Sequence, residues 1–270
     1  EGLTRFADPM VISLQALQEQ GAAYDKLHAN EFELRRHSRQ PSDLAILIYT
    51  SGTTGKPKGA MHSHAGMVYV MRGYSQYLGQ NEKDERMLFL PLCHIAERLG
   101  GMYSCIYSGA ILNFVENPDT VPENVREIAP TLFFAVPRVW EKFYSAVTIA
   151  IAEAGAIQQF IYHMSLVVGN AVAARVLQRQ RVPIWLKCSF YLARLLTLNN
   201  VRRMMGIERA RFLGTGAAPI SPDLVRWYLA LGIPMLEVWG QTESGGASTF
   251  MPYDHIVPGS IGKACDYNEV

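Results

Sequence analysis

The stretch from Tyr49 to Gly59 combines glycines, hydroxyls and lysines in a way that suits phosphate binding. It follows an unbroken apolar run, Leu44 to Ile48, which predicts a strand buried on both faces. Glycines let the backbone approach a ligand closely, hydroxyls donate hydrogen bonds, and lysines add positive charge. The residues that could hold phosphate oxygens are Thr50, Ser51, Gly52, Thr53, Thr54, Gly55 and Lys58.

The spacing in this loop differs from that of a Walker A loop, which has four residues between its glycines and ends in Gly-Lys-Ser/Thr. Here two residues separate Gly52 from Gly55, and Lys56 is followed by Pro57. The difference argues against an ordinary P-loop ATPase. A plain Gly/Thr-rich turn that binds nothing is the simpler alternative.

Residues 49–59 resemble the nucleotide-binding signature of the adenylate-forming superfamily, which comprises acyl-CoA synthetases, luciferases and the adenylation domains of peptide synthetases. The resemblance covers roughly residues 43–266. It implies an α/β fold, with parallel sheets flanked by helices, that forms the central part of the family's large N-terminal domain. It also implies ATP as a substrate and Mg²⁺ as a cofactor.

A second polar segment follows the apolar run 235–238 and consists of Trp239, Gly240, Gln241, Thr242 and Glu243. A carboxylate beside a hydroxyl could hold Mg²⁺ on a phosphate, although a lone Thr-Glu more often begins a helix. The segment resembles the family's aromatic-Gly-x-Thr-Glu motif, with tryptophan where tyrosine is commoner. The resemblance implies that Glu243 and Thr50 bind Mg²⁺, that Thr242 contacts the α-phosphate, and that Trp239 stacks on adenine.

A third segment, Gly214 to Pro219, is built from small residues that would let a flat base approach the backbone. By itself it could equally be a tight turn. It is similar to the family's adenine-binding loop, which would place four residues at the base: Gly216, Ala217, Ala218 and Pro219.

His94 follows a predicted strand in the sequence Pro-Leu-Cys-His. An isolated histidine at such a place is more often structural. The motif resembles a family position near the carboxylate that is activated, and the extension Ile95 to Arg98 is similar to long-chain acyl-CoA synthetases in particular.

Together the resemblances imply a long-chain fatty acid–CoA ligase, with a fatty acid, ATP and CoA as substrates. Thr50, His94, Thr242 and Glu243 would carry the catalysis. Another adenylate-forming enzyme, such as an adenylation domain or a luciferase-like protein, is an alternative. A non-catalytic nucleotide- or lipid-binding module is an alternative from a different class.

The elements around these motifs alternate in type along the chain. Apolar runs predict strands at 86–90, 110–115, 131–136, 210–213 and 235–239, with helices between them. A helix is also expected at 10–34 with Ser13 as its cap, and another opens at Pro137. Because this alternation predicts a parallel sheet, the polar loops should converge at the carboxyl ends of its strands.

Composition describes a globular protein: 49% of the 270 residues are apolar and 18% are charged. A net charge of +1 gives no reason to expect nucleic-acid binding. Four scattered cysteines predict reduced thiols, and the first residues show no signal-peptide pattern. We therefore expect a cytoplasmic location.

Residues 154–207 contain no Asp or Glu. The segment is otherwise apolar and is expected to form a helical, basic insertion at about 150–206. Such a surface suits peripheral contact with the inner face of a membrane, whereas a solvated helix face or a contact in a homo-oligomer are the alternatives. Its seven basic residues are Arg175, Arg179, Arg181, Lys187, Arg194, Arg202 and Arg203.

The resembled family continues past the point where this sequence stops, with a hinge and a small C-terminal domain. Residues 1–270 are therefore expected to form a partial N-terminal domain that binds ATP and the acyl substrate. We expect this chain alone not to complete a turnover.

Overall fold

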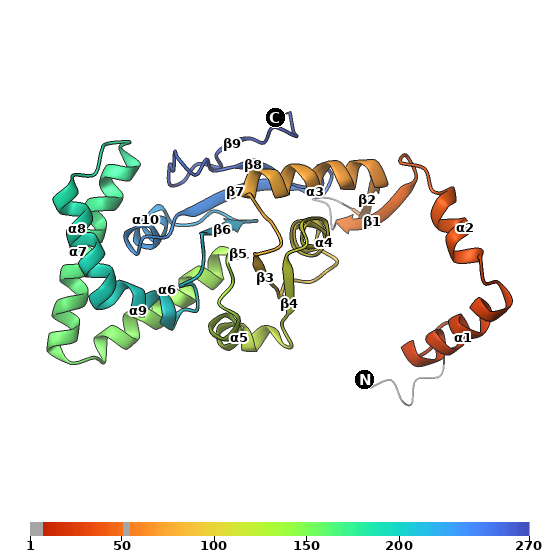
Figure 1. Cartoon of the computed structure of the whole chain (residues 1–270), viewed down its shortest axis with the longest axis horizontal. Helices are drawn as coiled ribbons and strands as arrows, with labels where there is room; N and C mark the ends of the chain where they lie inside the picture. The colour runs from red at the N-terminus through yellow and green to blue at the C-terminus, as the bar shows by residue number, and fades with distance from the viewer. Residues whose placement is uncertain (1–7, 51–54, 270) are drawn as a thin grey trace. The chain divides into compact units, whose positions relative to one another are not determined.

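The computed structural model describes residues 8–50 and 55–269 (Figure 1). It divides the chain into two compact units, residues 1–43 and residues 44–270. The first unit contains helices α1 (Leu14–Leu27) and α2 (Glu31–Ser38). Ser13 caps α1 as predicted, with its Oγ accepting a hydrogen bond from the Ala16 N–H at 3.1 Å.

The single helix predicted at 10–34 is wrong, because α1 ends at Leu27 and α2 begins at Glu31. The backbone N–H of His28 bonds back to the carbonyls of Tyr24 and Asp25 and closes the last turn of α1. Every residue of both helices is at least partly exposed.

The second unit begins with an antiparallel hairpin of β1 (Leu44–Thr50) and β2 (Lys58–Ser63). The expectation that residues 44–48 are buried on both faces is wrong. Ile48 is buried, whereas Leu44 and Leu47 are 47% and 45% exposed. Among the described strands β1 pairs with β2 alone, so most of its surface faces solvent.

Helix α3 (His64–Leu78) follows β2, and its N-cap is Ser63, whose Oγ accepts a hydrogen bond from the Gly66 N–H. The predicted strands at 86–90 and 110–115 are present as β3 (Glu85–Leu88) and β4 (Ile111–Phe114), which pair in parallel. Between them lie the π-helix η1 (Ala96–Tyr103) and α4 (Ser104–Ser108). The 3₁₀ turn η2 (Pro118–Thr120) and α5 (Val121–Ile128) lead to the next strand.

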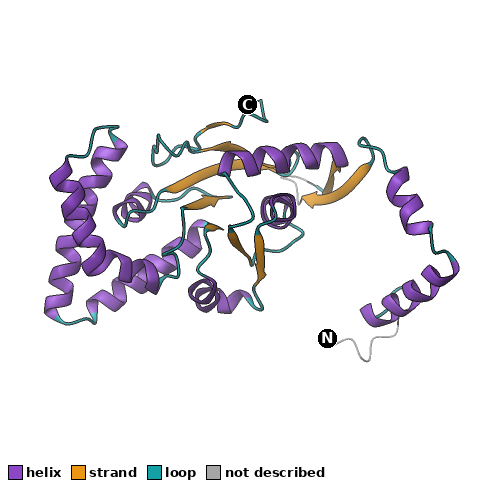
Figure 2. Cartoon of the chain, in the orientation of Figure 1, coloured by secondary structure: helices purple, strands orange, loops and turns teal. Residues whose placement is uncertain are grey.

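A five-stranded sheet, ordered β5-β6-β7-β8-β9, forms the centre of this unit (Figure 2). The predicted parallel pairing holds for β5, β6 and β7, but β8 and β9 run antiparallel, so the sheet is mixed. Its strands are β5 (Leu132–Ala135), β6 (Phe212–Gly216), β7 (Met235–Gln241), β8 (Gly246–Phe250) and β9 (Lys263–Ala264).

Helices pack on both faces of the sheet. Successive side chains of a strand point to opposite faces. Phe133 contacts Trp140, on α6 (Pro137–Ala152), at a ring-centroid distance of 5.2 Å. Its neighbour Phe134 contacts Phe250, which in turn lies against Tyr74 of α3. The sheet is therefore the middle of three layers, and the core lies between these aromatic residues.

The segment expected to be a helical insertion consists of helices. After α6 come α7 (Ala156–Leu177), α8 (Ile184–Ala193), the π-helix η3 (Arg194–Leu198) and α9 (Asn199–Met204). Helix α7 packs against α8 and against α10 (Pro222–Ala230). A Cβ on Gly169 of α7 would collide with the carbonyl oxygen of Ala230, so the two helices need glycine there.

Asp84 joins three distant parts of the chain just before β3, and it is 3% exposed. Its Oδ1 accepts a hydrogen bond from Thr131 Oγ1 at 2.7 Å. Its Oδ2 lies 2.8 Å from an Arg211 guanidinium nitrogen. This carboxylate therefore holds the starts of β3, β5 and β6 together.

Candidate functional site

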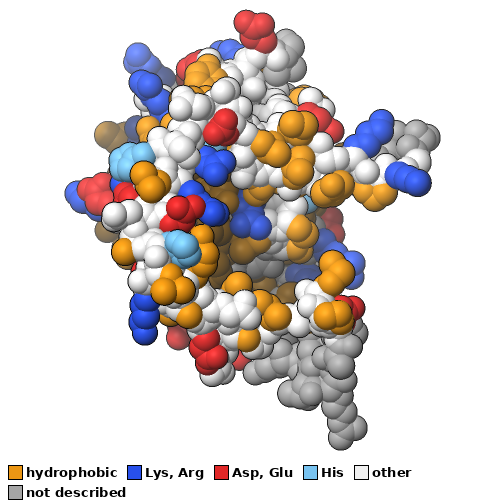
Figure 3. All heavy atoms as spheres, turned by 90° about the vertical axis from the view of Figure 1, so that its right-hand side faces the viewer, with side chains coloured by type: hydrophobic (Ala, Val, Ile, Leu, Met, Phe, Trp, Pro, Cys, Tyr) orange, Lys and Arg blue, Asp and Glu red, His pale blue; other side chains and the backbone are white. Residues whose placement is uncertain are grey.

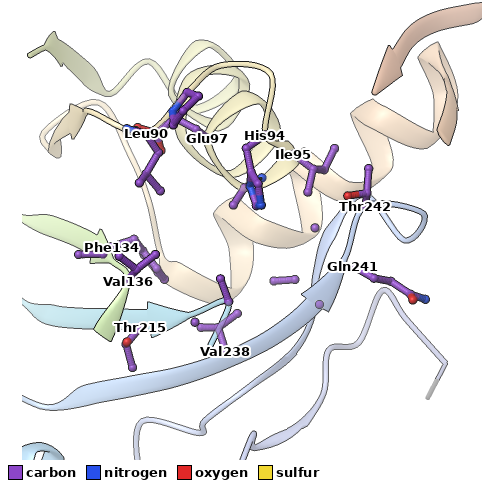
Figure 4. Close-up of a pocket in the computed structure, with 18 of the residues that line it drawn as sticks. Leu90, His94, Ile95, Glu97, Phe134, Val136, Thr215, Val238, Gln241 and Thr242 are labelled. Atoms are coloured by element: carbon purple, nitrogen blue, oxygen red, sulfur yellow. Dashed lines mark hydrogen bonds between the residues drawn. The ribbon is translucent and has the colours of Figure 1, made fainter. Parts of the chain in front are cut away.

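A cavity of about 480 Å³ lies at the carboxyl ends of β5, β6 and β7 (Figure 4). Three of the four predicted loops meet there, as expected for the strand ends of a parallel sheet. The cavity is lined by His94 from the loop after β3 and by Gly216 and Ala217, at the end of β6 and just after it. Gly240 and Gln241 line it from the end of β7, and Thr242 from the turn that follows.

The fourth loop lies apart from this lining. Ser51, Gly52, Thr53 and Thr54 fall outside the described residues. Thr50, Gly55 and Lys58 belong to the β1–β2 hairpin and do not line the cavity. Thr50 Oγ1 lies 3.5 Å from the Lys58 carbonyl oxygen, at the edge of hydrogen-bonding range. The predicted phosphate contacts of this loop stay predictions.

Four other predicted residues also lie outside the described lining of the cavity: Ala218, Pro219, Trp239 and Glu243. Val238 lines the cavity. Trp239 is the next residue along β7, so its side chain points to the opposite face of the sheet, where it is 41% exposed. The Glu243 side chain is exposed in the turn that follows Thr242. The expected adenine and Mg²⁺ contacts therefore stay predictions.

The turn between β7 and β8 depends on its glycines. A Cβ on Gly240 would collide with the carbonyl oxygen of Gly246. Gly245 and Gly246 have φ of +82° and +114°, which side-chain-bearing residues rarely adopt. Ser244 Oγ lies 3.2 Å from the Gly246 carbonyl oxygen and fixes the turn further. These contacts hold Thr242 at the edge of the cavity.

The end of β6 is strained and closely packed. Ala217 has φ of +66°, in the left-handed region that favours glycine. A Cβ on Gly216 would approach the Val238 carbonyl oxygen to 2.8 Å. Strain of this kind persists where the surroundings impose it, often at ligand sites.

Thr215, just before this bend, is a cavity residue that the sequence analysis did not select. It is 2% exposed, and its Oγ1 has no hydrogen-bond partner among the described residues. Buried hydroxyls are normally hydrogen-bonded, so a polar group in the cavity could bond to this one. Its position in the Gly-Thr-Gly segment was a usable signal.

His94 extends from the loop after β3 (Figure 4). Its Nδ1 lies 3.2 Å from the backbone nitrogen of Ala96, whose N–H donates to it. A neutral imidazole that accepts through Nδ1 carries its proton on Nε2. The ring can therefore donate a hydrogen bond from Nε2 to a carboxylate.

The inner wall of the cavity carries charged residues that sequence reasoning did not assign to the site. Glu97 Oε1 accepts hydrogen bonds from the backbone N–H groups of Phe89 at 2.8 Å and Leu90 at 3.1 Å. Burial raises the pKa of Glu97, and these two hydrogen bonds oppose the shift. In the sequence Glu97 stands directly before Arg98, so no pattern marks it as buried.

Arg86 lies in the same wall, buried in β3. Its guanidinium donates to Gln80 Oε1 at 3.2 Å, to Ser104 Oγ at 3.1 Å and to the Gly100 carbonyl, and it lies 5.3 Å from the centre of the Phe134 ring. Desolvation raises the pKa of the neighbouring Tyr74 hydroxyl to about 12. In the sequence Arg86 is the last of five consecutive charged residues, 82–86, so its burial is seen only in the structure.

Comparison with known proteins identifies the family. Residues 6–270 match the family described as AMP-binding enzyme. The chain belongs to this family. The expected membership of the adenylate-forming superfamily is thereby confirmed.

Curated relatives of this AMP-binding chain include long-chain fatty acid–CoA ligases. It is 34% identical over 221 residues to the long-chain fatty acid–CoA ligase ACSBG2 of Gallus gallus. The matched region is 78% of this chain and 28% of the relative. It is 27% identical over 269 residues to long chain acyl-CoA synthetase 7, peroxisomal, of Arabidopsis thaliana, which covers 98% of this chain and 36% of the relative. The chain thus spans well under half the length of these relatives.

Solved structures share the fold of this AMP-binding chain. The inhibitor-bound N-terminal domain of FACL13 from Mycobacterium tuberculosis superposes with a TM-score of 0.57 at 21% identity, covering 85% of this chain and 45% of that one. ATP-bound MatB from Rhodopseudomonas palustris gives a TM-score of 0.55 at 23% identity, covering 84% and 35%. The predicted fold, an α/β N-terminal domain of adenylate-forming enzymes, is confirmed.

Proposed function

We propose that this chain is the nucleotide- and acyl-binding part of an ATP- and Mg²⁺-dependent long-chain fatty acid–CoA ligase. Membership of the AMP-binding family supports the adenylate-forming chemistry. The names of relatives at about 30% identity support a fatty acid as the substrate.

The observation that carries the proposal is the meeting of three motif segments at one cavity. His94, Gly216 and Thr242 lie far apart in the sequence, yet all three line this space. His94 offers a hydrogen-bond donor for a carboxylate, and Thr242 offers a hydroxyl for a phosphate. Gly216 lets a nucleotide base approach the backbone closely.

The proposed reaction has two steps. An oxygen of the fatty carboxylate attacks the α-phosphorus of ATP, and the bond to pyrophosphate breaks to give an acyl-adenylate. The thiolate of CoA then attacks the acyl carbon, and AMP leaves. In the first step His94 would orient the carboxylate through its Nε2–H, and Thr242 would hydrogen-bond the α-phosphate.

The residues available for Mg²⁺ fit a metal that is shared with the substrate. The described residues contain no cluster of three His, Cys, Asp or Glu side chains that could hold a metal alone. Mg²⁺ is commonly bound by one or two carboxylates together with substrate phosphates. The exposed Glu243 carboxylate, next to Thr242 at the rim of the cavity, suits the role of a Mg²⁺ ligand. Thr50 is the second proposed ligand. When bound, the ion would neutralise phosphate charge.

Isothermal titration tests the proposal directly. We expect the chain to bind a non-hydrolysable acyl-adenylate analogue more tightly than ATP with Mg²⁺, because the analogue fills both the nucleotide and the acyl regions. Thr215→Val, which removes the buried hydroxyl at nearly constant volume, should weaken this binding. Thr148→Val is the matched control, since Thr148 is exposed on α6 and bonds its own helix.

A non-catalytic nucleotide- or lipid-binding module is the second candidate. The observation that favours it is the position of Trp239 and Glu243 outside the described cavity lining. Absence of analogue binding by the correctly folded chain would contradict the ligase site and favour the module.

A further inference from the structure

Helix α7 exposes an apolar stripe to solvent. Ile157, Phe160, Met164 and Val167 recur at intervals of three and four residues, which places them on one side of the helix. They are between 51% and 76% exposed. The stripe is thus a continuous apolar surface and not a set of isolated side chains.

Helix α8 packs against α7 and exposes apolar side chains as well. Ile184 and Tyr191 lie seven residues apart, about two helical turns, and so share one side of α8. Trp185 and Leu192 are also seven residues apart and share the adjacent side. All four are at least 55% exposed. We call the exposed apolar sides of α7 and α8 the α7–α8 surface.

The opposite side of α7 is packed into the protein. Tyr162 is buried, and its hydroxyl accepts a hydrogen bond from Trp227 Nε1 of α10 at 3.2 Å. Gly169 lies directly against the backbone of Ala230. By length and composition α7 could cross a membrane, but these contacts hold it along the protein surface.

The segment that forms this surface carries cations alone, although the exposed Glu153 lies just before it and Arg202 within it is buried. The segment 154–207 holds seven cations and no acid, and none of the seven forms an ion pair within the described residues. Arg179, Arg181 and Lys187 are exposed where α7 connects to α8. The face shown in Figure 3, in contrast, carries Asp and Glu side chains among its cations.

We propose that the α7–α8 surface docks on an anionic lipid bilayer. The apolar side chains would enter the boundary between headgroups and acyl chains, and the cations would lie at the lipid phosphates. Trp185 and Tyr191 are residue types that are enriched at the membrane interface.

Charge complementarity favours an anionic bilayer over a second copy of this chain and over a nucleic acid. Two copies of this chain meeting through the same surface would bring two acid-free basic segments together, which is unfavourable. A nucleic acid would pair with the cations but leave the apolar stripe exposed to water. An anionic bilayer satisfies both the charge and the apolar area.

Co-sedimentation with vesicles tests the proposal. We compare vesicles of phosphatidylcholine alone with vesicles that also contain phosphatidylserine, at low and high salt. The chain should bind the anionic vesicles preferentially and release them as salt rises. The triple variant Arg179→Glu, Arg181→Glu and Lys187→Glu should bind roughly tenfold more weakly or worse.

Two controls make the test specific. The triple variant Lys26→Glu, Lys83→Glu and Lys142→Glu makes the same charge change at exposed lysines elsewhere and should retain most of the binding. Phe160→Ser with Trp185→Ser should also weaken binding, while circular dichroism shows that the variant folds. In the parent chain, Trp185 fluorescence should shift to the blue on vesicle addition, and Trp185→Phe should remove that shift.

Three results would overturn the proposal. The first is equal binding to neutral and anionic vesicles, and the second is the absence of vesicle binding at low salt. The third is a concentration-dependent dimer in sedimentation velocity that Phe160→Ser with Trp185→Ser abolishes, because the surface would then belong to a second copy.

Discussion

Glu97 Oε1 accepts a hydrogen bond from the backbone N–H of Leu90 at 3.1 Å, seven residues earlier in the chain. The same oxygen accepts a second one from Phe89 at 2.8 Å. The loop between these residues carries His94, so the buried carboxylate sets where the imidazole enters the cavity.

Replacing Glu97 by alanine should destabilise the protein. Two backbone N–H groups would lose their acceptor, which costs about 1–3 kcal/mol for each buried group left unsatisfied. Urea unfolding followed by circular dichroism measures the change. Glu116→Ala, at an exposed loop position, should change the free energy of unfolding by less than about 0.5 kcal/mol; equal effects of the two variants would contradict the assigned contacts.

The Glu97→Gln variant tests the raised pKa of this carboxyl. Because burial raises that pKa above 4.5 in the folded protein, the folded state binds the proton more tightly than the unfolded chain does. The stabilising contribution of the carboxyl is therefore fully present below pH 4.5 and is lost as pH rises through the raised pKa. Glutamine keeps an acceptor oxygen and cannot ionise.

We therefore expect the free energy of unfolding of the parent chain, relative to Glu97→Gln, to fall as pH rises above about 4.5. Chemical unfolding at a series of pH values measures it. A difference that stays constant with pH would show that Glu97 titrates alike in both states.

His94→Ala should impair adenylation in a ligase that contains this chain. A hydrogen bond to a charged group is worth about 1.5–3 kcal/mol, which corresponds to roughly 10–100-fold in rate. Pyrophosphate exchange at limiting fatty acid measures the loss. His37→Ala serves as the control because His37 is exposed in the N-terminal unit, and a comparable loss there would exclude a specific role for His94.

Glu243→Ala should lower adenylation at least ~100-fold in the complete enzyme, since it removes a proposed Mg²⁺ ligand. Glu243→Asp should retain part of the activity and require more Mg²⁺. Glu127→Ala changes an exposed carboxylate on α5 and should leave the rate unaltered. Exchange at the parental rate in Glu243→Ala would refute the metal role.

Gly240→Ala should disrupt the turn after β7. The added methyl group collides with the Gly246 backbone, and such overpacking costs about 1–3 kcal/mol. Acyl-adenylate analogue binding should be lost together with stability. Gly21→Ala in α1 has open space around it and should instead raise helix stability by about 0.5–1 kcal/mol without altering binding.

The sequence predicted the parallel strands well because buried parallel strands are continuous apolar runs, such as 132–135. The same rule failed for 44–48. An apolar run shows that a strand can be buried, but burial depends on which partners cover it, and β1 has β2 alone among the described strands.

Motif residues were found more readily than the residues that support them. His94, Gly216 and Thr242 stand in short recognisable patterns, and the structure places all three at the cavity. Arg86 and Glu97 act through burial and through contacts that only the structure reveals. Thr215, in contrast, stands inside the Gly-Thr-Gly segment and could have been selected from the sequence.

The Asp84 carboxylate has a consequence for how the chain folds. It binds Thr131 and Arg211, which lie 47 and 127 residues further along the chain. Loop-closure entropy must be overcome before such contacts form, so high contact order slows folding. Refolding of residues 44–270 should therefore be slow compared with that of a helical bundle, and its rate should respond to substitutions at this acid more than to changes in helix propensity.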